Sequence, residues 1–186
     1  MRNRWVSYPR TITVTGFGGA VLALAMLFWT TPSGADASTA AAGMDRFSKN
    51  CFSPRMTGAR AAEVFSGAGL RYDFYDLDPF LGSNAPTPAT KAPVTEGTDR
   101  RCEVSFDGNH ASDAVRAVTR ALTRERIQTE VAVPATYAAT EGTALLAARR
   151  LSPLKIAVVH VGTRPGPNGI ETFMNVERIP LRQGSN

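Results

Sequence analysis

His160 and Glu171 form the only pair in the sequence that could act as an acid–base couple. They lie in two alternating apolar segments, Lys155 to Val161 and Ile170 to Ile179, which predict strands joined by a loop rich in glycine and proline. In a hairpin symmetric about that loop, His160 faces Glu171, and the carboxylate can tune the imidazole as a base. Because no serine or cysteine nucleophile in a recognisable motif accompanies them, we favour a cross-strand charge pair on a solvated face.

Metal and cofactor sites lack their usual patterns. Histidine occurs only at positions 110 and 160, without the spacing of a metal site. Asp73, Asp76 and Asp78 form an acidic group, but the glycine and the terminal glutamate of a helix–loop–helix calcium site are missing. The glycine-rich loop before Ile170 matches no phosphate-binding loop. We therefore expect no metal and no cofactor.

Aromatic residues and prolines gather between residues 70 and 99. Proline fixes φ and removes a backbone donor, so we expect a long proline-rich loop here, with an edge strand near Arg71 to Tyr75. Aromatic side chains anchor protein interfaces, which makes this loop a candidate interaction surface. In the alternative that we favour, the aromatics pack over the core. The aromatic residues of this surface are Tyr72, Phe74, Tyr75 and Phe80.

Three arginines, Arg116, Arg120 and Arg124, recur on one face of the best helical segment of the chain. Such a stripe could contact nucleic acid. Acidic residues interrupt it, however, so we interpret it as a solvated helix face and expect no nucleic-acid partner.

The first 37 residues are typical of a secretory signal peptide. Three arginines within residues 1–10 precede the apolar run Ala20 to Trp29, and a proline and a glycine lead to the triplet Ala35-Asp36-Ala37. We predict cleavage after Ala37 and a periplasmic or secreted product. In the alternative, residues 11–31 stay as a membrane anchor; they reach spanning length only when their threonines and glycines are counted.

Residues 38–186 have the size and composition of a single exported domain. The whole chain is 43% hydrophobic and 20% charged, which is ordinary globular composition. Of its 21 basic and 16 acidic residues, removal of the leader takes three arginines and one aspartate, which leaves a mild positive charge. That excess is a solubility property and does not indicate a nucleic-acid partner.

Cys51 and Cys102 are the only cysteines in the sequence. An exported chain meets oxidants, and the separation of the two residues is far longer than in a redox Cys-x-x-Cys pair. We therefore predict a structural disulfide between them, with a reactive or intermolecular thiol as the alternative.

The periodicities predict an α+β domain: a mainly antiparallel sheet of four to five strands, one long packed helix and short N-terminal helices. The segment 137–151 is compatible with a helix or a hairpin. The predicted helices are residues 45–52, 57–66 and 110–127, and the predicted strands, beyond the edge strand and the two named above, are 101–107 and 129–133.

These observations favour a small exported, non-catalytic binding or accessory protein held by one disulfide, with an unknown protein or small ligand of the cell envelope as its partner. Two alternatives remain at this point. One is an envelope hydrolase centred on His160 and Glu171, with Glu177 as a further candidate; the other is a membrane-tethered accessory subunit that keeps its leader.

Overall fold

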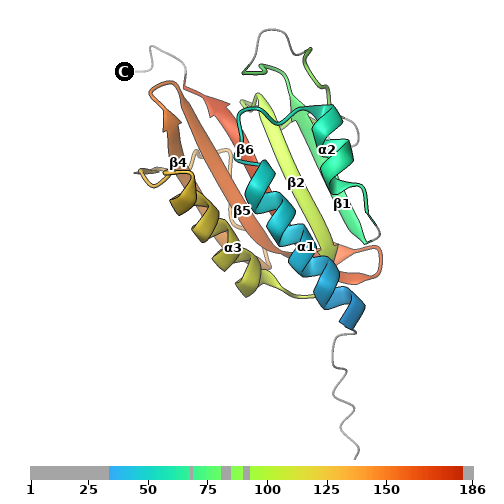
Figure 1. Ribbon diagram of the computed structural model, residues 1–186. Helices are drawn as coiled ribbons and strands as arrows, with labels where there is room; N and C mark the ends of the chain where they lie inside the picture. The colour runs from blue at the N-terminus through green and yellow to red at the C-terminus, as the bar shows by residue number, and fades with distance from the viewer. Residues whose placement is uncertain (1–33, 68, 81–84, 90–92, 182–186) are drawn as a thin grey trace, which may run out of the picture. The chain divides into compact units, whose positions relative to one another are not determined.

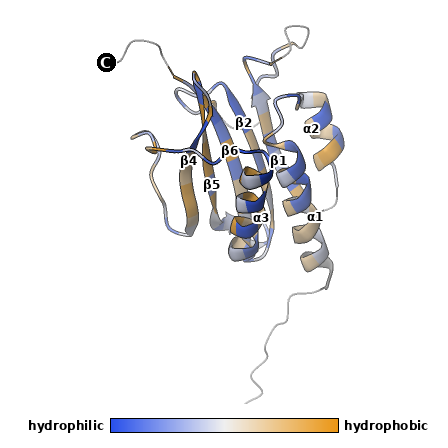
Figure 2. Cartoon of the chain, turned by 60° about the vertical axis from the view of Figure 1, so that its left-hand side comes forward, coloured by the Kyte–Doolittle hydropathy of each residue, from blue (hydrophilic) through white to orange (hydrophobic). Residues whose placement is uncertain are grey.

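The computed structural model describes residues 34–67, 69–80, 85–89 and 93–181. The predicted leader up to residue 33, and with it the proposed anchor 11–31, lies outside the described residues. The described residues form one antiparallel sheet with three helices on one of its faces (Figures 1 and 2). The helices are α1 (Gly34–Asn50), α2 (Gly58–Phe65) and α3 (Ala111–Arg124); the strands are β1 (Leu70–Asp76), β2 (Arg100–Asp107), β3 (Glu130–Val131), β4 (Thr143–Ser152), β5 (Lys155–Gly166) and β6 (Gly169–Pro180).

The predicted α+β class and antiparallel sheet are confirmed, but the sheet has six strands in the order β1-β2-β6-β5-β4-β3. The additional strand is β4, which comes from the segment 137–151 that the sequence left open. Its alanines and leucines favour a helix locally. Pairing with β5 along almost its whole length overrides that preference.

The β5–β6 hairpin has a different register from the predicted one. The strands continue to Gly166 and Gly169, so that Arg164 faces Glu171 and His160 faces Asn175. The segment from Gly162 to Gly169 was predicted to be a loop, but Pro165 lies within β5. It is tolerated because β4 ends its pairing at Gly162, which leaves the last part of β5 with a neighbour on one side only.

The helices bury one face of the sheet, and helix α1 is longer than predicted because its first half is rich in alanine, the best helix former. It approaches β2 closely: a Cβ on Gly43 would lie 2.7 Å from Cδ1 of Phe106. The predicted cleavage point after Ala37 falls in the first turn of α1. Buried core residues from all three helices include Phe47, Ala61, Phe65, Ala114, Val118 and Leu122, and those from the sheet include Val104, Phe106, Val159, Val161 and Met174.

The predicted disulfide between Cys51 and Cys102 is confirmed. It joins the chain just after α1 to the first part of β2, with both residues in the core. The covalent bond therefore holds the end of a helix on the sheet that it covers.

On the opposite face of the sheet, the β3–β4 connection (residues 132–142) and the loop before β2 make hydrogen bonds to residues of the strands. Tyr75 and Val158 point to this face and are nonetheless buried, at 0% and 1% exposed. Tyr137 in the β3–β4 connection donates a hydrogen bond to Glu177 of β6. No helix in the described part of the chain is long and apolar enough to span a membrane.

Candidate ligand-binding site

A cavity of about 460 Å³ opens at the end of the sheet where β2 and β5 begin and β4 and β6 end. The chain just after α1 and just after α3 forms its other walls. We call it the end cavity. Its lining residues are Cys51, Phe52, Pro54, Phe80, Arg100, Glu125, Ile127, Leu151, Ser152, Lys155, Ala157, Val176 and Arg178.

Apolar side chains make up most of the walls of the end cavity. Ala157 and Val176 come from adjacent strands and point to the helix side, because the register places them on the same face as the core. Two apolar residues at the cavity face water: Phe80 is 67% exposed and Leu151 is 37% exposed. Exposed large apolar groups beside a cavity are typical of a binding site for an apolar ligand.

Three cations also line the end cavity, each at a strand end: Arg100 begins β2, Lys155 begins β5, and Arg178 lies near the end of β6. Arg100 and Arg178 are directly opposite each other in the sheet. Both are buried, at 6% and 8% exposed. Buried arginines are rare unless they are paired, so their partners decide what they can do.

Arg178 is fully paired with aspartates. Its Nε donates to Oδ1 of Asp99 at 2.5 Å, and its Nη2 donates to Oδ1 of Asp76 at 2.8 Å. Lys155 joins the same group through Asp78 at 2.7 Å and Asp99 at 3.4 Å. The pairing with Lys155 holds the pKa of Asp78 below its usual value. This network closes the end of the sheet around the cavity.

Arg100 is less completely paired. Its Nη2 donates to the carbonyl oxygen of Ser53 at 2.8 Å, and its guanidinium lies 5.3 Å from the ring centre of Phe74. Its Nε lies 3.7 Å from Oδ2 of Asp76, too far for a hydrogen bond. Neither of these two buried atoms has a hydrogen-bond partner among the described residues. Burial lowers the pKa of Arg100 to about 10, although Asp76 opposes the shift.

The apolar walls and the buried cation of the end cavity are suited to binding a small ligand. Apolar walls can take up hydrocarbon or aromatic surface. A buried guanidinium that lines the cavity and makes one hydrogen bond among the described residues favours a ligand that brings an acceptor, because a charge-assisted bond offsets part of its desolvation cost.

His160 and Glu171 do not face each other, so the predicted cross-strand pair is wrong. The register places His160 opposite Asn175, four residues along β6 from Glu171. The Nε2 of His160 lies 2.9 Å from Oγ1 of Thr143, and its ring meets that of Phe173 edge-on. Burial lowers the pKa of His160, with Glu177 opposing and Arg164 assisting the shift.

Glu171 is held by two arginines on the face of the sheet opposite the helices. Arg71 Nε donates to its Oε2 at 2.9 Å, and Arg164 Nε donates to its Oε1 at 2.6 Å. Arg164 also reaches Glu103 at 2.6 Å. With both oxygens accepting from guanidinium groups, Glu171 is a member of a structural charge network on this face.

The structure separates the four aromatic residues of the candidate interaction surface. Phe74 and Tyr75 are buried, and Tyr72 is half-buried against Phe65. Only Phe80 among the four is exposed, and it lines the end cavity. Of the predicted interaction surface, only Phe80 is available for contact with a partner, and it lies at the end cavity.

The acidic group and the arginine stripe are also distributed among structural contacts. Asp73 pairs with Arg101 on the face opposite the helices, whereas Asp76 and Asp78 belong to the network beside the end cavity. Within the described residues, no group of side chains could hold a metal ion. Of the stripe, Arg124 donates to the carbonyl oxygen of Ser48 at 2.6 Å, which joins α3 to α1.

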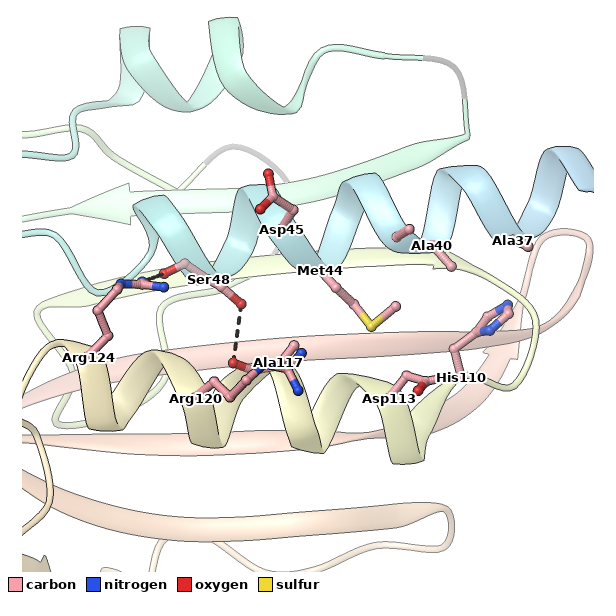
Figure 3. A pocket seen from close by; sticks show the side chains of 11 residues that line it. Ala37, Ala40, Met44, Asp45, Ser48, His110, Asp113, Ala117, Arg120 and Arg124 are labelled. Carbon is pink, nitrogen blue, oxygen red and sulfur yellow. Dashed lines mark hydrogen bonds between the residues drawn. The ribbon is translucent and has the colours of Figure 1, made fainter.

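A second cavity, of about 510 Å³, lies between α1 and α3 (Figure 3). Ser48 donates from Oγ to the carbonyl oxygen of Ala117 at 3.4 Å across it, and Arg124 reaches over to Ser48 (Figure 3). Asp113 and Arg120 on its side are exposed. We read this groove as the solvated seam between two packed helices, and the end cavity as the better ligand site.

The alternation of residues in two strands contains a signal for the end cavity. Cys102 and Val104 define the core face of β2, and Arg100 has the same parity. Met174 and Val176 define the core face of β6, and Arg178 has the same parity. A charged residue at a core-facing position is costly unless it has a partner or a function, so the pattern pointed to a buried charged site at this end of the sheet.

Comparisons of the chain with protein-family models, with curated proteins and with solved structures give no match.

Proposed function

We propose that this chain is an exported, non-catalytic domain that binds a small, mainly apolar molecule of the cell envelope in the end cavity. The observation that carries the proposal is the cavity itself, at about 460 Å³. This volume lies within the range of about 300–1,000 Å³ that is usual for small-molecule sites.

Export is supported by the leader pattern and by the disulfide, which is compatible with an oxidising compartment. Cleavage after Ala37 would keep Ala40 and the later buried residues of α1 in the product; Ala40 is the first buried residue from position 37 on, where burial is described. N-terminal sequencing of the protein recovered from the cell envelope tests this part. A product that begins at Ser38 supports the proposal, whereas one that keeps Met1 supports the membrane-tethered alternative.

Binding is tested with N-phenyl-1-naphthylamine, an uncharged dye that becomes fluorescent in apolar surroundings. We expect the protein purified from the cell envelope to bind it, and we expect Ala157→Phe to weaken binding at least ten-fold by filling the cavity. Ala139→Phe is the matched control, because Ala139 is exposed in the β3–β4 connection and is not part of the cavity lining. Dye binding that is absent, or equal in all three proteins, contradicts the proposal.

The Ala157→Phe variant adds volume at a fully buried position, so its folding is checked by its thermal unfolding transition. Leu151→Glu provides a second variant that carries little packing risk, since Leu151 is 37% exposed. A charge there places a solvated group on the apolar wall, and we expect it to weaken dye binding as well.

A further inference from the structure

The polar side of the end cavity presents mainly positively charged side chains to the cavity. Arg100, Lys155 and Arg178 line the cavity, whereas the aspartates that pair with them do not. The ion pairs therefore form a layer with cations toward the cavity and anions behind them. Such a layer attracts a negative group on the cavity side even though its charges balance overall.

Arg100 is the cation with the most to gain from a ligand. It is 6% exposed and lines the cavity, and among the described residues its guanidinium makes one hydrogen bond, from Nη2 to the carbonyl oxygen of Ser53, while its Nε is 3.7 Å from Asp76. Arg178, in comparison, has both aspartates in hydrogen-bond contact. An acceptor that approaches Arg100 adds a charge-assisted bond and offsets a desolvation cost that is already present.

Two features disfavour a negatively charged ligand, but their effect is weaker than that of the three cations. Glu125 also lines the cavity, but it is exposed and already pairs with Arg124 at 2.9 Å. The chain leaves α1 and α3 at this end, and the carboxyl ends of helices favour cations by about 0.3–1 kcal/mol when exposed. The carbonyl oxygens of Ser48 and Ser53 there already accept from Arg124 and Arg100.

We infer that the ligand of the end cavity is an anionic amphiphile, with its carboxylate or other acidic head beside Arg100 and its hydrocarbon body against Ala157, Val176 and Leu151. This inference rests on the proposed function, since it needs the cavity to bind, and it adds the charge of the ligand. A fatty acid is the simplest molecule of this class.

The experiment compares three probes built on a ten-carbon chain that carry different head groups: decanoate, decanol and decyltrimethylammonium. Each is titrated calorimetrically below its micelle concentration into the protein purified from the cell envelope, without detergent. We expect decanoate to bind at least ten-fold more tightly than decanol, and the ammonium probe to bind most weakly.

The outcomes separate this inference from the proposed function. Equal binding of decanoate and decanol, or tighter binding of the ammonium probe, overturns the inference and leaves an apolar site in place. Failure of all three probes, together with failure of the uncharged dye, overturns both.

A variant pair assigns the head-group contact. In Arg100→Met we expect the advantage of decanoate over decanol to fall below three-fold, whereas in Arg120→Met, which removes an exposed cation outside the end cavity, we expect it to be unchanged. A folded Arg100→Met that keeps the full advantage overturns the role of Arg100. If that variant does not fold, the ranking of the three probes on the wild-type protein still decides the inference.

Discussion

The hydroxyl of Tyr137 donates a hydrogen bond to Oε2 of Glu177, across 40 residues of sequence. The other carboxylate oxygen, Oε1, accepts from Arg101 at 2.5 Å and from Thr95 at 3.0 Å. Glu177 is 1% exposed. One buried carboxylate therefore fastens β2, the loop before it and the β3–β4 connection to the same strand.

Replacing Tyr137 with phenylalanine leaves Glu177 with one partner fewer in a buried place. We expect Tyr137→Phe to lower the free energy of unfolding by about 2 kcal/mol, the usual size for a hydrogen bond to a charged group. Urea unfolding monitored by circular dichroism measures it. A loss below about 0.5 kcal/mol would show that the β3–β4 connection is not held by this contact.

The same hydrogen bond predicts a dependence on alkaline pH. Burial, the hydrogen bond and the charge of Glu177 together raise the pKa of Tyr137 well above its ordinary value of about 10. A raised folded-state pKa gives stability that is complete below pH 10 and is lost as the pH rises further. The difference in unfolding free energy between wild type and Tyr137→Phe should therefore shrink above pH 10; a difference that grows there contradicts this reading.

His160 should titrate below the usual pKa of about 6.5, because burial disfavours its charged form. The stability that comes with the neutral ring is complete above pH 6.5 and is lost as the pH falls below it. Proton NMR of the two histidine rings measures the pKa, with His160→Gln to assign the signal. A His160 pKa above 6.5 would indicate a nearby carboxylate and would revive the acid–base alternative.

Removal of the disulfide should destabilise the protein strongly. The chain-entropy estimate for a separation of 51 residues is about 4 kcal/mol, at the upper end of what disulfides usually contribute. We expect the double variant Cys51→Ser/Cys102→Ser to lose about 2–4 kcal/mol in urea unfolding. Reduced wild-type protein is the control and should unfold at the same urea concentration as the variant. Unchanged stability would show that the bond is not structural.

Arg178 should be among the most sensitive positions outside the apolar core. In Arg178→Met, two buried aspartates, Asp76 and Asp99, lose their shared partner. Breaking a buried ion pair from one side typically costs about 3–5 kcal/mol. Arg116→Met is the matched control, because Arg116 and Asp113 pair on the exposed face of α3, where such pairs contribute about 0–1 kcal/mol. Equal losses in the two variants would contradict the network described above.

Much of the fold follows from patterns that act over short distances. The alternation around Val104 predicts β2, and the apolar stripe of α3 predicts the one long helix expected from the sequence. The disulfide follows from two cysteines and a predicted export signal. These features were predictable because one buried face or one pairing rule is enough to specify each of them.

The rest depends on contacts between distant parts of the chain. The extension of β5 through Pro165 becomes understandable only once β4 is seen to end its pairing at Gly162. That register moves His160 away from Glu171 and removes the acid–base pair. The end cavity could not be predicted from motifs, because its cations, Arg100 and Arg178, lie at core-facing positions of β2 and β6 that become neighbours only when these strands pair.

The most direct measurement is a crystal structure of the protein soaked with 10-bromodecanoate, in which the anomalous signal of bromine locates the end of the chain. The account predicts bromine in the end cavity or at its mouth near Phe80, with the carboxylate beside Arg100. Bromine in the groove between α1 and α3, or an end cavity that holds only water at saturating ligand, would contradict it.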